Sequence, residues 1–459
     1  MSLLRFFLLC AALVAPAAAA GPPAPPQPSL RAFPGTSCLA SFADCVNYLE
    51  AWAGPRVPDW VVHSAVYSYR ARKPVFDAWG QPVAGADGGQ ACILTPQSGR
   101  IFYPPAWRVV PGARLPLVVY PHFTSVRKRS VPSEFGGHEW VFGAAAALCY
   151  GFAVAMPDLP GGGADALDYH PFCQGAGLAY AILDGVPAMR AAFRDDPWLA
   201  AAGYGWDGRL FVLGYSEGGY AALAAVKEWT THAEAYAARD GFRLTGAACM
   251  AGPFDLSGLA RQGLLKPGAA SDLDFLLPYL LVAYHRIYGP RVDPLQAFAP
   301  ALLEPRADGD ILSWLDGSLD GFTIADLIAG RLGKPRYRLP FRDLLNPEWV
   351  ARELADPAYA TSDLHQVLQE NDLHQGWTPT TPILFCHSPA DDDVDFQQSL
   401  SAMASLGAGI RRAGGDPDRL LALKRIGDAR AGITHIQAIP LALATGFRWI
   451  HDGMPMAWE

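Results

Sequence analysis

Short apolar runs alternate with segments of helical spacing along most of the chain. Residues 115–120 and 382–387 are continuous apolar runs, as expected for strands that are buried on both faces. Residues 178–193 carry apolar side chains at helical spacing, and residues 140–148 also favour a helix. The same pattern predicts strands over residues 61–70, 152–156, 210–213, 245–250 and 420–426, and helices over residues 220–229, 396–411 and after His435. This alternation predicts an α/β fold with a mostly parallel central sheet and helices on both faces.

The alternation is interrupted once, over about residues 254–379. This stretch is irregular and rich in Leu, Pro, Asp and Trp, with short helical patches such as residues 270–284. We predict that it is a helical cap inserted between two strands of one sheet, so that residues 60–253 and 380–459 form a single divided core. A second domain in series is a poorer account, because too few predicted strands remain for another sheet. A self-contained appendage that packs on the flank of the core is the alternative to a cap.

One motif, Gly214-Tyr215-Ser216-Glu217-Gly218, lies at the junction of a predicted strand and a predicted helix. The pattern Gly-x-Ser-x-Gly is weak alone, but here a strand runs straight into it and an alanine-rich helix follows. In that setting the serine occupies a strained turn, and the glycines leave room where the two backbones crowd together. The backbone amides of the helix N-terminus then stabilise developing negative charge. Ser216 is therefore the candidate nucleophile, and an ordinary glycine-rich turn is the alternative.

A serine nucleophile needs a base, and after such a turn the partners follow in the order serine, acid, histidine. Asp391 lies just beyond the predicted strand over residues 382–387. A carboxylate in that position can hold an imidazole in the required tautomer. Asp391 is the candidate acid, with Asp392, Asp393 and Asp395 in the same acidic turn as rivals.

The candidate base is His435, which follows the last predicted strand and opens the last predicted helix. A histidine on a loop at the end of a strand can reach across to a serine at the end of a neighbouring strand. His451 lies inside the terminal helical segment and is the weaker candidate. The remaining histidines precede Asp391 and break the chain order.

An oxyanion hole is expected from two backbone N–H groups. The first belongs to Glu217, the residue after the nucleophile, and the second to His122 or Phe123 in the loop after the strand over residues 115–120. For His122, a loop residue that only packs its side chain is an equally good interpretation.

The N-terminus has the pattern of a secretory signal peptide over residues 1–20, with a positive start, an apolar run and a small-residue cleavage site near Ala20. A proline-rich leader follows, and we assign residues 21–59 to an N-terminal extension. The protein is therefore expected to be secreted or periplasmic. The apolar run is too short to span a bilayer, which takes about 20 apolar residues.

Cysteine usage is compatible with an oxidising compartment. Cys38 and Cys45 are the best local pair, but connectivity cannot be deduced from the sequence. Cys149, Cys249 and Cys386 lie in apolar segments, where buried free thiols are a serious alternative.

Composition narrows the function classes further. The chain is 51% hydrophobic and only 17% charged, which excludes a disordered protein. A net charge of −8 gives no electrostatic reason to bind nucleic acid or an anionic membrane, and no stable membrane insertion is expected. The one compact basic run, over residues 127–129, is predicted to be a solvated loop. No metal-binding or cofactor-binding spacing occurs, so we predict neither, and we interpret the acidic run at 391–395 and the pair Asp316 and Asp320 as solvated turns.

Taken together, these motifs resemble the secretory lipase family of α/β-hydrolases, which includes the fungal lipase A enzymes and many bacterial secreted esterases. The resemblance rests on the segments Tyr120-Pro121-His122-Phe123-Thr124, Val131-Pro132-Ser133, Met156-Pro157-Asp158, His170-Pro171-Phe172, Leu183-Asp184-Gly185-Val186, Gly214-Tyr215-Ser216-Glu217-Gly218-Gly219 and Gly252-Pro253-Phe254-Asp255-Leu256-Ser257, with those around Asp391 and His435. It implies an α/β-hydrolase fold with a helical cap, and hydrolysis of small-molecule or lipid esters by a Ser-Asp-His triad without a cofactor.

The chain departs from the family pattern at two positions. Phe123 stands where the bacterial members commonly have glycine in a His-Gly-Thr loop, and Ser388 stands where glycine usually precedes the acid by three residues. Phe123 bears on the oxyanion geometry and on the size of the acyl pocket. Two rival functions remain at this stage: a secreted peptidase or amidase with the same triad, and a non-catalytic binding protein that kept the fold.

Overall fold

A computed structural model describes residues 41–50, 62–86, 88–105, 108–166, 168–266, 268–271, 273–336 and 339–456. The predicted signal peptide, the proline-rich leader and Cys38 lie outside these residues. Within them, Cys45, Cys149, Cys249 and Cys386 are buried free thiols. No helix in the described part of the chain combines the length and the apolar character needed to cross a membrane.

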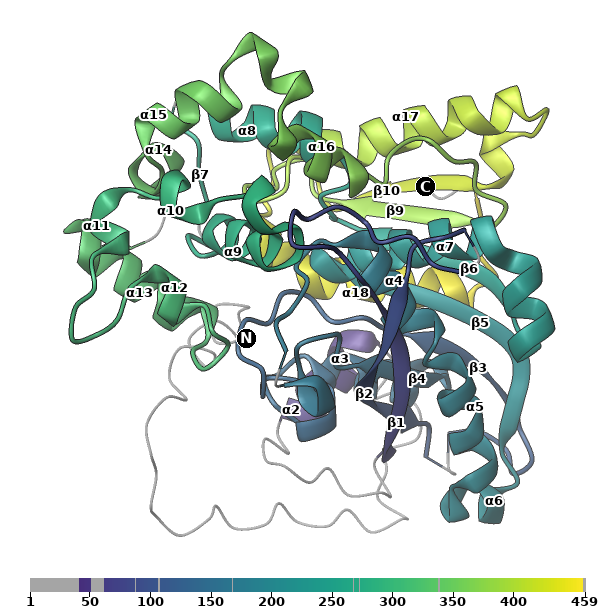
Figure 1. Cartoon of the computed structure of the whole chain (residues 1–459). Coiled ribbons are helices and arrows are strands. Elements are labelled where there is room, and N and C mark those ends of the chain that lie inside the picture. The colour runs from purple at the N-terminus through teal and green to yellow at the C-terminus, as the bar shows by residue number, and fades with distance from the viewer. Residues whose placement is uncertain are drawn as a thin grey trace, which may run out of the picture. The chain divides into compact units, whose positions relative to one another are not determined.

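The centre of the fold is an eight-stranded sheet with strand order β1-β2-β4-β3-β5-β6-β9-β10 (Figure 1). Strands β1 and β2 pair antiparallel, and β2 pairs antiparallel with β4, whereas every other neighbour is parallel. The strands are β1 (His63–Pro74), β2 (Cys92–Tyr103), β3 (Arg114–Val119), β4 (Ala153–Pro157), β5 (Gly205–Tyr215), β6 (Arg243–Met250), β9 (Ile383–His387) and β10 (Leu421–Arg425). Strands β4 and β9 are buried at every residue, which explains their unbroken apolar sequences.

Helices cover both faces of this sheet. One layer contains α4 (Gly175–Leu183), α5 (Val186–Asp195), α7 (Glu217–Asp240) and α17 (Gln397–Arg412), and the other contains α2 (Phe42–Glu50), α3 (Trp140–Tyr150) and α18 (His435–His451), while α6 (Pro197–Ala202) follows α5. Runs of buried alanine in α3 and α7 let these helices lie close to the sheet. The observed architecture is therefore the predicted mostly parallel sheet with helices on both faces.

Two predicted helices differ in detail from the observed ones. The segment predicted as one helix over residues 178–193 forms α4 and α5, because Pro187 lies in the first turn of a new helix and cannot supply an N–H to continue α4. The patch predicted over residues 270–284 begins as the short strand β7 (Ala270–Ser271), and its helix starts only at Leu276.

Strands β6 and β9 are neighbours in the sheet, yet more than a hundred residues lie between them in sequence. Their register pairs Ala247 with Ile383. The described residues in between add no strand to the eight-stranded sheet. They form β7 and β8 (Leu339–Pro340) and the helices α8 (Arg261–Leu265), α9 (Leu276–Tyr288), α10 (Pro294–Ala297), α11 (Pro300–Leu303), α12 (Ile311–Trp314), α13 (Gly321–Leu332), α14 (Phe341–Leu344), α15 (Pro347–Trp349) and α16 (Asp363–Glu370). Figure 1 shows α10 to α15, in green, gathered to the left of the sheet. This insertion is the segment that we predicted as a cap.

The two ends of the insertion are tied together at its base. The carbonyl oxygen of Phe254 accepts hydrogen bonds from the backbone N–H groups of Leu373 and His374, at 2.8 and 3.1 Å. The carboxylate of Asp372 accepts the N–H groups of Leu256 and Ser257, at 2.7 and 3.1 Å. The insertion therefore leaves and rejoins the core through one hydrogen-bonded neck.

Candidate active site

Ser216 occupies a strained turn between β5 and α7. Its backbone angles are φ 57° and ψ −123°, a conformation that costs a non-glycine residue of order 1–3 kcal/mol. A Cβ added at Gly214 would collide with the backbone of Gly218, and one added at Gly218 would collide with the carbonyl oxygen of Pro121. Both glycines are therefore required sterically, as the motif predicted. The turn places the Ser216 hydroxyl at the N-terminus of α7, at the carboxyl edge of the parallel strands.

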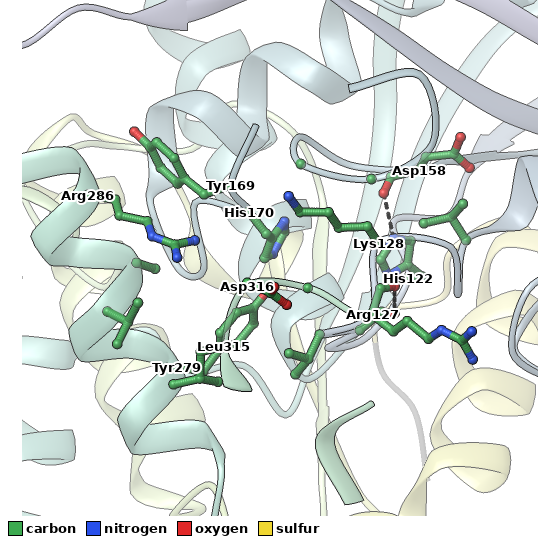
Figure 2. Close-up of a pocket in the computed structure, with 18 residues that line it drawn as sticks. His122, Arg127, Lys128, Asp158, Tyr169, His170, Tyr279, Arg286, Leu315 and Asp316 are labelled. Atoms are coloured by element: carbon green, nitrogen blue, oxygen red, sulfur yellow. Dashed lines mark hydrogen bonds between the residues drawn. The ribbon is translucent and has the colours of Figure 1, made fainter. Parts of the chain in front are cut away.

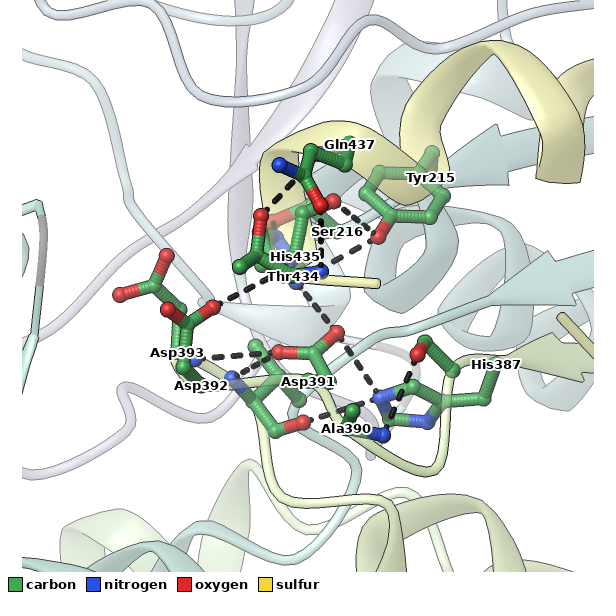
Figure 3. Close-up of polar contacts among 12 residues, drawn as sticks. Tyr215, Ser216, His387, Ala390, Asp391, Asp392, Asp393, Thr434, His435 and Gln437 are labelled. Atoms are coloured by element: carbon green, nitrogen blue, oxygen red, sulfur yellow. Dashed lines mark hydrogen bonds and ion pairs between the residues drawn. The ribbon is translucent and has the colours of Figure 1, made fainter. Parts of the chain in front are cut away.

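Three residues from distant parts of the chain meet at this edge (Figure 3). The Nε2 atom of His435 lies 2.9 Å from the Oγ atom of Ser216. The Nδ1 atom of His435 lies 2.6 Å from the Oδ2 atom of Asp391. When Nδ1–H donates to the carboxylate, Nε2 is left free to accept the serine proton.

The position of His435 is held through its backbone as well as its ring. It is the first residue of α18, and Thr434 before it forms a capping box with Gln437. The backbone N–H of His435 donates to Asp392 at 3.0 Å, and the Tyr215 hydroxyl donates to the His435 carbonyl oxygen at 2.7 Å. These contacts orient the loop that carries the imidazole.

Asp391 accepts hydrogen bonds on both carboxylate oxygens. Its Oδ1 atom accepts the backbone N–H groups of Asp393 and Val394, at 3.1 and 2.8 Å, and its Oδ2 atom faces His435. Burial raises the pKa of Asp391, but the charge of His435 and the hydrogen bonds from His387 and His435 together lower it well below its usual range. Asp391 is therefore a carboxylate whenever the imidazole is beside it.

The rival residues make other contacts. Asp392 binds the backbone rather than the ring of His435, Asp393 accepts a hydrogen bond from Ser271, and Asp395 pairs with Lys266 at 2.9 Å. His451 is exposed at the far end of α18 and contacts Asp452 at 2.9 Å. Of these candidates, His435 is the one that contacts Ser216, and Asp391 is the one that hydrogen-bonds to the His435 ring.

Two further residues that sequence reasoning did not assign support this arrangement. His387 is fully buried and its Nε2 atom lies 3.1 Å from Asp391 Oδ2, while Ser399 lies 2.9 Å from its other nitrogen. Chain order had set this histidine aside, although its position four residues before Asp391 was a usable signal. Ser388, which replaces the usual glycine, donates to the carbonyl oxygen of Ile433 at 2.6 Å and so ties the end of β9 to the loop before His435.

Candidate oxyanion donors lie on both sides of Ser216. Among the described residues, the backbone N–H groups of Glu217 and His122 have no backbone hydrogen-bond acceptor. The N–H of Phe123 instead donates to the Glu139 carboxyl at 2.8 Å, and the Tyr120 hydroxyl donates to the same oxygen at 2.6 Å. The His122 ring is buried between the carbonyl oxygens of Phe123 and Asp158.

Asp255, Asp372 and His374 form the one group in the described part of the chain whose side chains are close enough to share a metal ion. All three lie at the neck of the insertion, where Ser257 Oγ donates to Asp372 at 2.5 Å and the N–H of Gly258 donates to Asp255 at 2.8 Å. These hydrogen bonds account for the burial of both carboxylates, so we assign no metal to the group.

The central sheet, the strained turn at Ser216 and the two loops that meet it define an α/β-hydrolase fold. A putative hydrolase from Legionella pneumophila has this fold, with a TM-score of 0.63 and 19% identity over 91% of this chain and 97% of that chain. A ligand-bound form of the rice cell wall degrading esterase LipA from Xanthomonas oryzae has a TM-score of 0.63 and 21% identity, over 90% of this chain and 95% of that chain. Candida antarctica lipase A in its closed state has a TM-score of 0.54 and 15% identity, over 86% of this chain and 79% of that chain. No family model and no curated protein sequence matches the chain. At these identities the likeness establishes the fold.

Proposed function

We propose that this chain is a secreted serine hydrolase of carboxylic esters, related to the secretory lipases. The observation that carries the proposal is the hydrogen-bonded series Asp391, His435 and Ser216, with contacts of 2.6 and 2.9 Å at the carboxyl edge of the sheet. The esterase and lipase names of the structural neighbours and the motif resemblance support it. The signal-peptide pattern supports export.

In the proposed acylation step, Ser216 Oγ attacks the ester carbonyl carbon while His435 Nε2 takes the serine proton. The carbonyl oxygen becomes an oxyanion that the N–H of Glu217 and one N–H of the loop at His122 and Phe123 stabilise. For the Phe123 N–H to act as an oxyanion donor, it must give up its hydrogen bond to Glu139 and donate to the oxyanion instead. The tetrahedral intermediate then expels the alcohol, which takes the proton back from His435.

Deacylation repeats these steps with water as the nucleophile. His435 accepts a proton from water, the hydroxide attacks the acyl carbon, and Ser216 leaves with the proton from His435. Asp391 keeps the imidazole in one tautomer and stabilises its positive charge in both steps. The insertion over residues 254–379 is proposed to act as a cap that lines the substrate site.

A substrate panel tests the proposed function. We expect 4-nitrophenyl esters from acetate to palmitate to be hydrolysed, peptide anilides to be turned over at least about a hundredfold more slowly, and a fluorophosphonate probe to label Ser216. Faster turnover of anilides would favour the peptidase, and absence of both labelling and turnover would favour the non-catalytic binding protein.

The pH dependence of the reaction provides a second test. Burial lowers the pKa of His435, but the charge of Asp391 and its hydrogen bond raise it more, so the pKa lies above the ordinary value of 6.5. The imidazole must be neutral to accept a proton, so activity is full above this pKa and lost as the pH falls through it. We expect the acidic limb of kcat/KM for 4-nitrophenyl butyrate to have its midpoint above pH 6.5. A midpoint at or below the ordinary value would contradict the coupling to Asp391.

A further inference from the structure

A cleft lies between the core and the insertion (Figure 2). The loop after β3 and the turn after β4 form its core side. Helix α9 and the turn at Leu315, Asp316 and Gly317 form its other side. The cleft therefore has one wall from the sheet domain and one from the insertion.

Two contacts connect this cleft to the two residues that follow Ser216. His170 lines the cleft, and its Nε2 atom bonds to the carboxylate of Glu217, the residue after Ser216. His122 also lines the cleft, and its loop packs so closely on Gly218 that a Cβ there would collide with the carbonyl oxygen of Pro121. The cleft and the candidate nucleophile therefore share the loop at His122 and the start of α7 as neighbours.

Three cations among the described residues line this space, and two of them, Lys128 and Arg286, face it from opposite walls, whereas the Arg127 side chain points away from it in Figure 2. In Figure 2 the Lys128 ammonium group and the Arg286 guanidinium group point from the two sides toward the region around Asp316. Lys128 is held in place because its backbone N–H donates to the Gly317 carbonyl oxygen at 3.0 Å and its side-chain stem lies directly against Gly317. Neither cation forms an ion pair with a carboxylate in the described part of the chain, whereas the neighbouring Arg129 lies 3.9 Å from Glu134.

The carboxylates of the cleft do not neutralise these cations fully. Asp158 already accepts hydrogen bonds from Ser98 and from the backbone N–H of Ser133, the latter at 2.8 Å. Asp316 accepts the N–H of Ser318 at 2.7 Å. Among the described residues, Asp316 is therefore the one carboxylate of the cleft that faces Lys128 and Arg286, in a protein whose net charge is −8. The loop over residues 127–129, predicted to be solvated, thus contributes Lys128 to the cleft that His122 also lines.

We propose that this cleft binds an anionic group of the substrate, a carboxylate or a phosphate attached to the ester, and that Lys128 and Arg286 determine this specificity. The proposal rests on the proposed ester hydrolysis and names its substrate class. Arginine binds such oxyanions through two parallel hydrogen bonds, and lysine adds a point charge. The two side chains come from the core and from the insertion, so the anionic group bridges both.

Matched pairs of esters test this specificity. The first pair is mono-4-nitrophenyl glutarate and its methyl ester, which differ by one carboxylate charge on the acyl side. The second pair is 1-butyrylglycerol 3-phosphate and 1-butyrylglycerol, which differ by a phosphate on the alcohol side. We expect kcat/KM to be at least about tenfold higher for the anion in one pair, as for a charge-assisted contact, and the ratio to fall with added salt. A preference in the first pair alone identifies a carboxylate, and one in the second alone identifies a phosphate.

Variants of the cationic residues distinguish a specific contact of Lys128 and Arg286 with the anionic group from a general attraction by nearby positive charge. In the double variant Lys128→Gln, Arg286→Gln the ratio should fall to about one, whereas Arg129→Gln, next to the cleft but not lining it, should keep the wild-type ratio. A wild-type ratio of one or less in both pairs, or a ratio that the double variant leaves unchanged, overturns the specificity while the hydrolysis of neutral esters stands. If no ester of either pair is hydrolysed and the fluorophosphonate probe does not label Ser216, the proposed function itself fails.

Discussion

Replacing Ser216 with alanine is expected to lower the turnover of esters by a factor of about a million, or about 8 kcal/mol of transition-state stabilisation. In the proposed mechanism the substitution removes the atom that forms the acyl bond and leaves His435 without a serine proton to accept. Turnover of 4-nitrophenyl butyrate by the purified variant measures the loss, and the fluorophosphonate probe should no longer label it.

The control for this variant is a serine of the same protein outside the site. Ser405→Ala, in helix α17, should keep the wild-type rate. Both variants should unfold at nearly the wild-type temperature, since each removes a single hydroxyl. A Ser216→Ala protein that retains more than about a thousandth of the wild-type rate would show that another residue is the nucleophile.

Asp391→Asn is expected to lower kcat by a factor of about ten thousand, the loss seen when an amide replaces the acid of such a triad. The amide group can donate to His435 Nδ1, which favours the tautomer that carries its proton on Nε2. That tautomer cannot accept the serine proton. Loss of the carboxylate charge also removes the largest of the causes that raise the pKa of His435, while Asp392 and Asp393 remain, so the acidic limb of the residual activity should move to lower pH.

The neighbouring Asp392→Asn is the matched control. Its carboxylate holds the backbone N–H of His435 at 3.0 Å and an amide oxygen can accept the same bond, so a loss of less than about tenfold is expected. If Asp392→Asn is the more damaging variant, the acid role belongs to Asp392. Comparing kcat for the two variants on one ester decides between them.

The strands could be predicted where burial on both faces forces an unbroken apolar sequence, as in β3, β4 and β9. Strand β2 was missed because Pro96 and several polar residues interrupt it. In the folded chain each of these side chains has a partner: Gln97 Nε2 donates to Asp165 at 3.1 Å, Ser98 donates to Asp158, and Arg100 donates to the carbonyl oxygen of Pro132 at 2.9 Å. Hydrogen-bond partners from distant segments offset the cost of burying the polar residues of β2. The pattern of apolar and polar residues along β2 does not reveal these partners.

The candidate site also has a part that the sequence could predict and a part that it could not. Ser216, Asp391 and His435 were predictable because each follows a strand, and the carboxyl ends of parallel strands meet at one edge whatever the loops do. Their relative position also depends on local rules, namely the glycines around Ser216 and the capping box before His435.

Residues that act through contacts distant in sequence were decided only by the tertiary structure. The capture of the Phe123 N–H by Glu139 and the approach of Lys128 and Arg286 across one cleft depend on how loops and the insertion pack. His387 lies only four residues before Asp391, but its burial against the carboxylate also appears only in the folded chain. Chain order and strand ends are local properties that a sequence carries directly. A hydrogen bond or a charge pair between segments depends on distances of a few ångströms that exist only after the chain has folded.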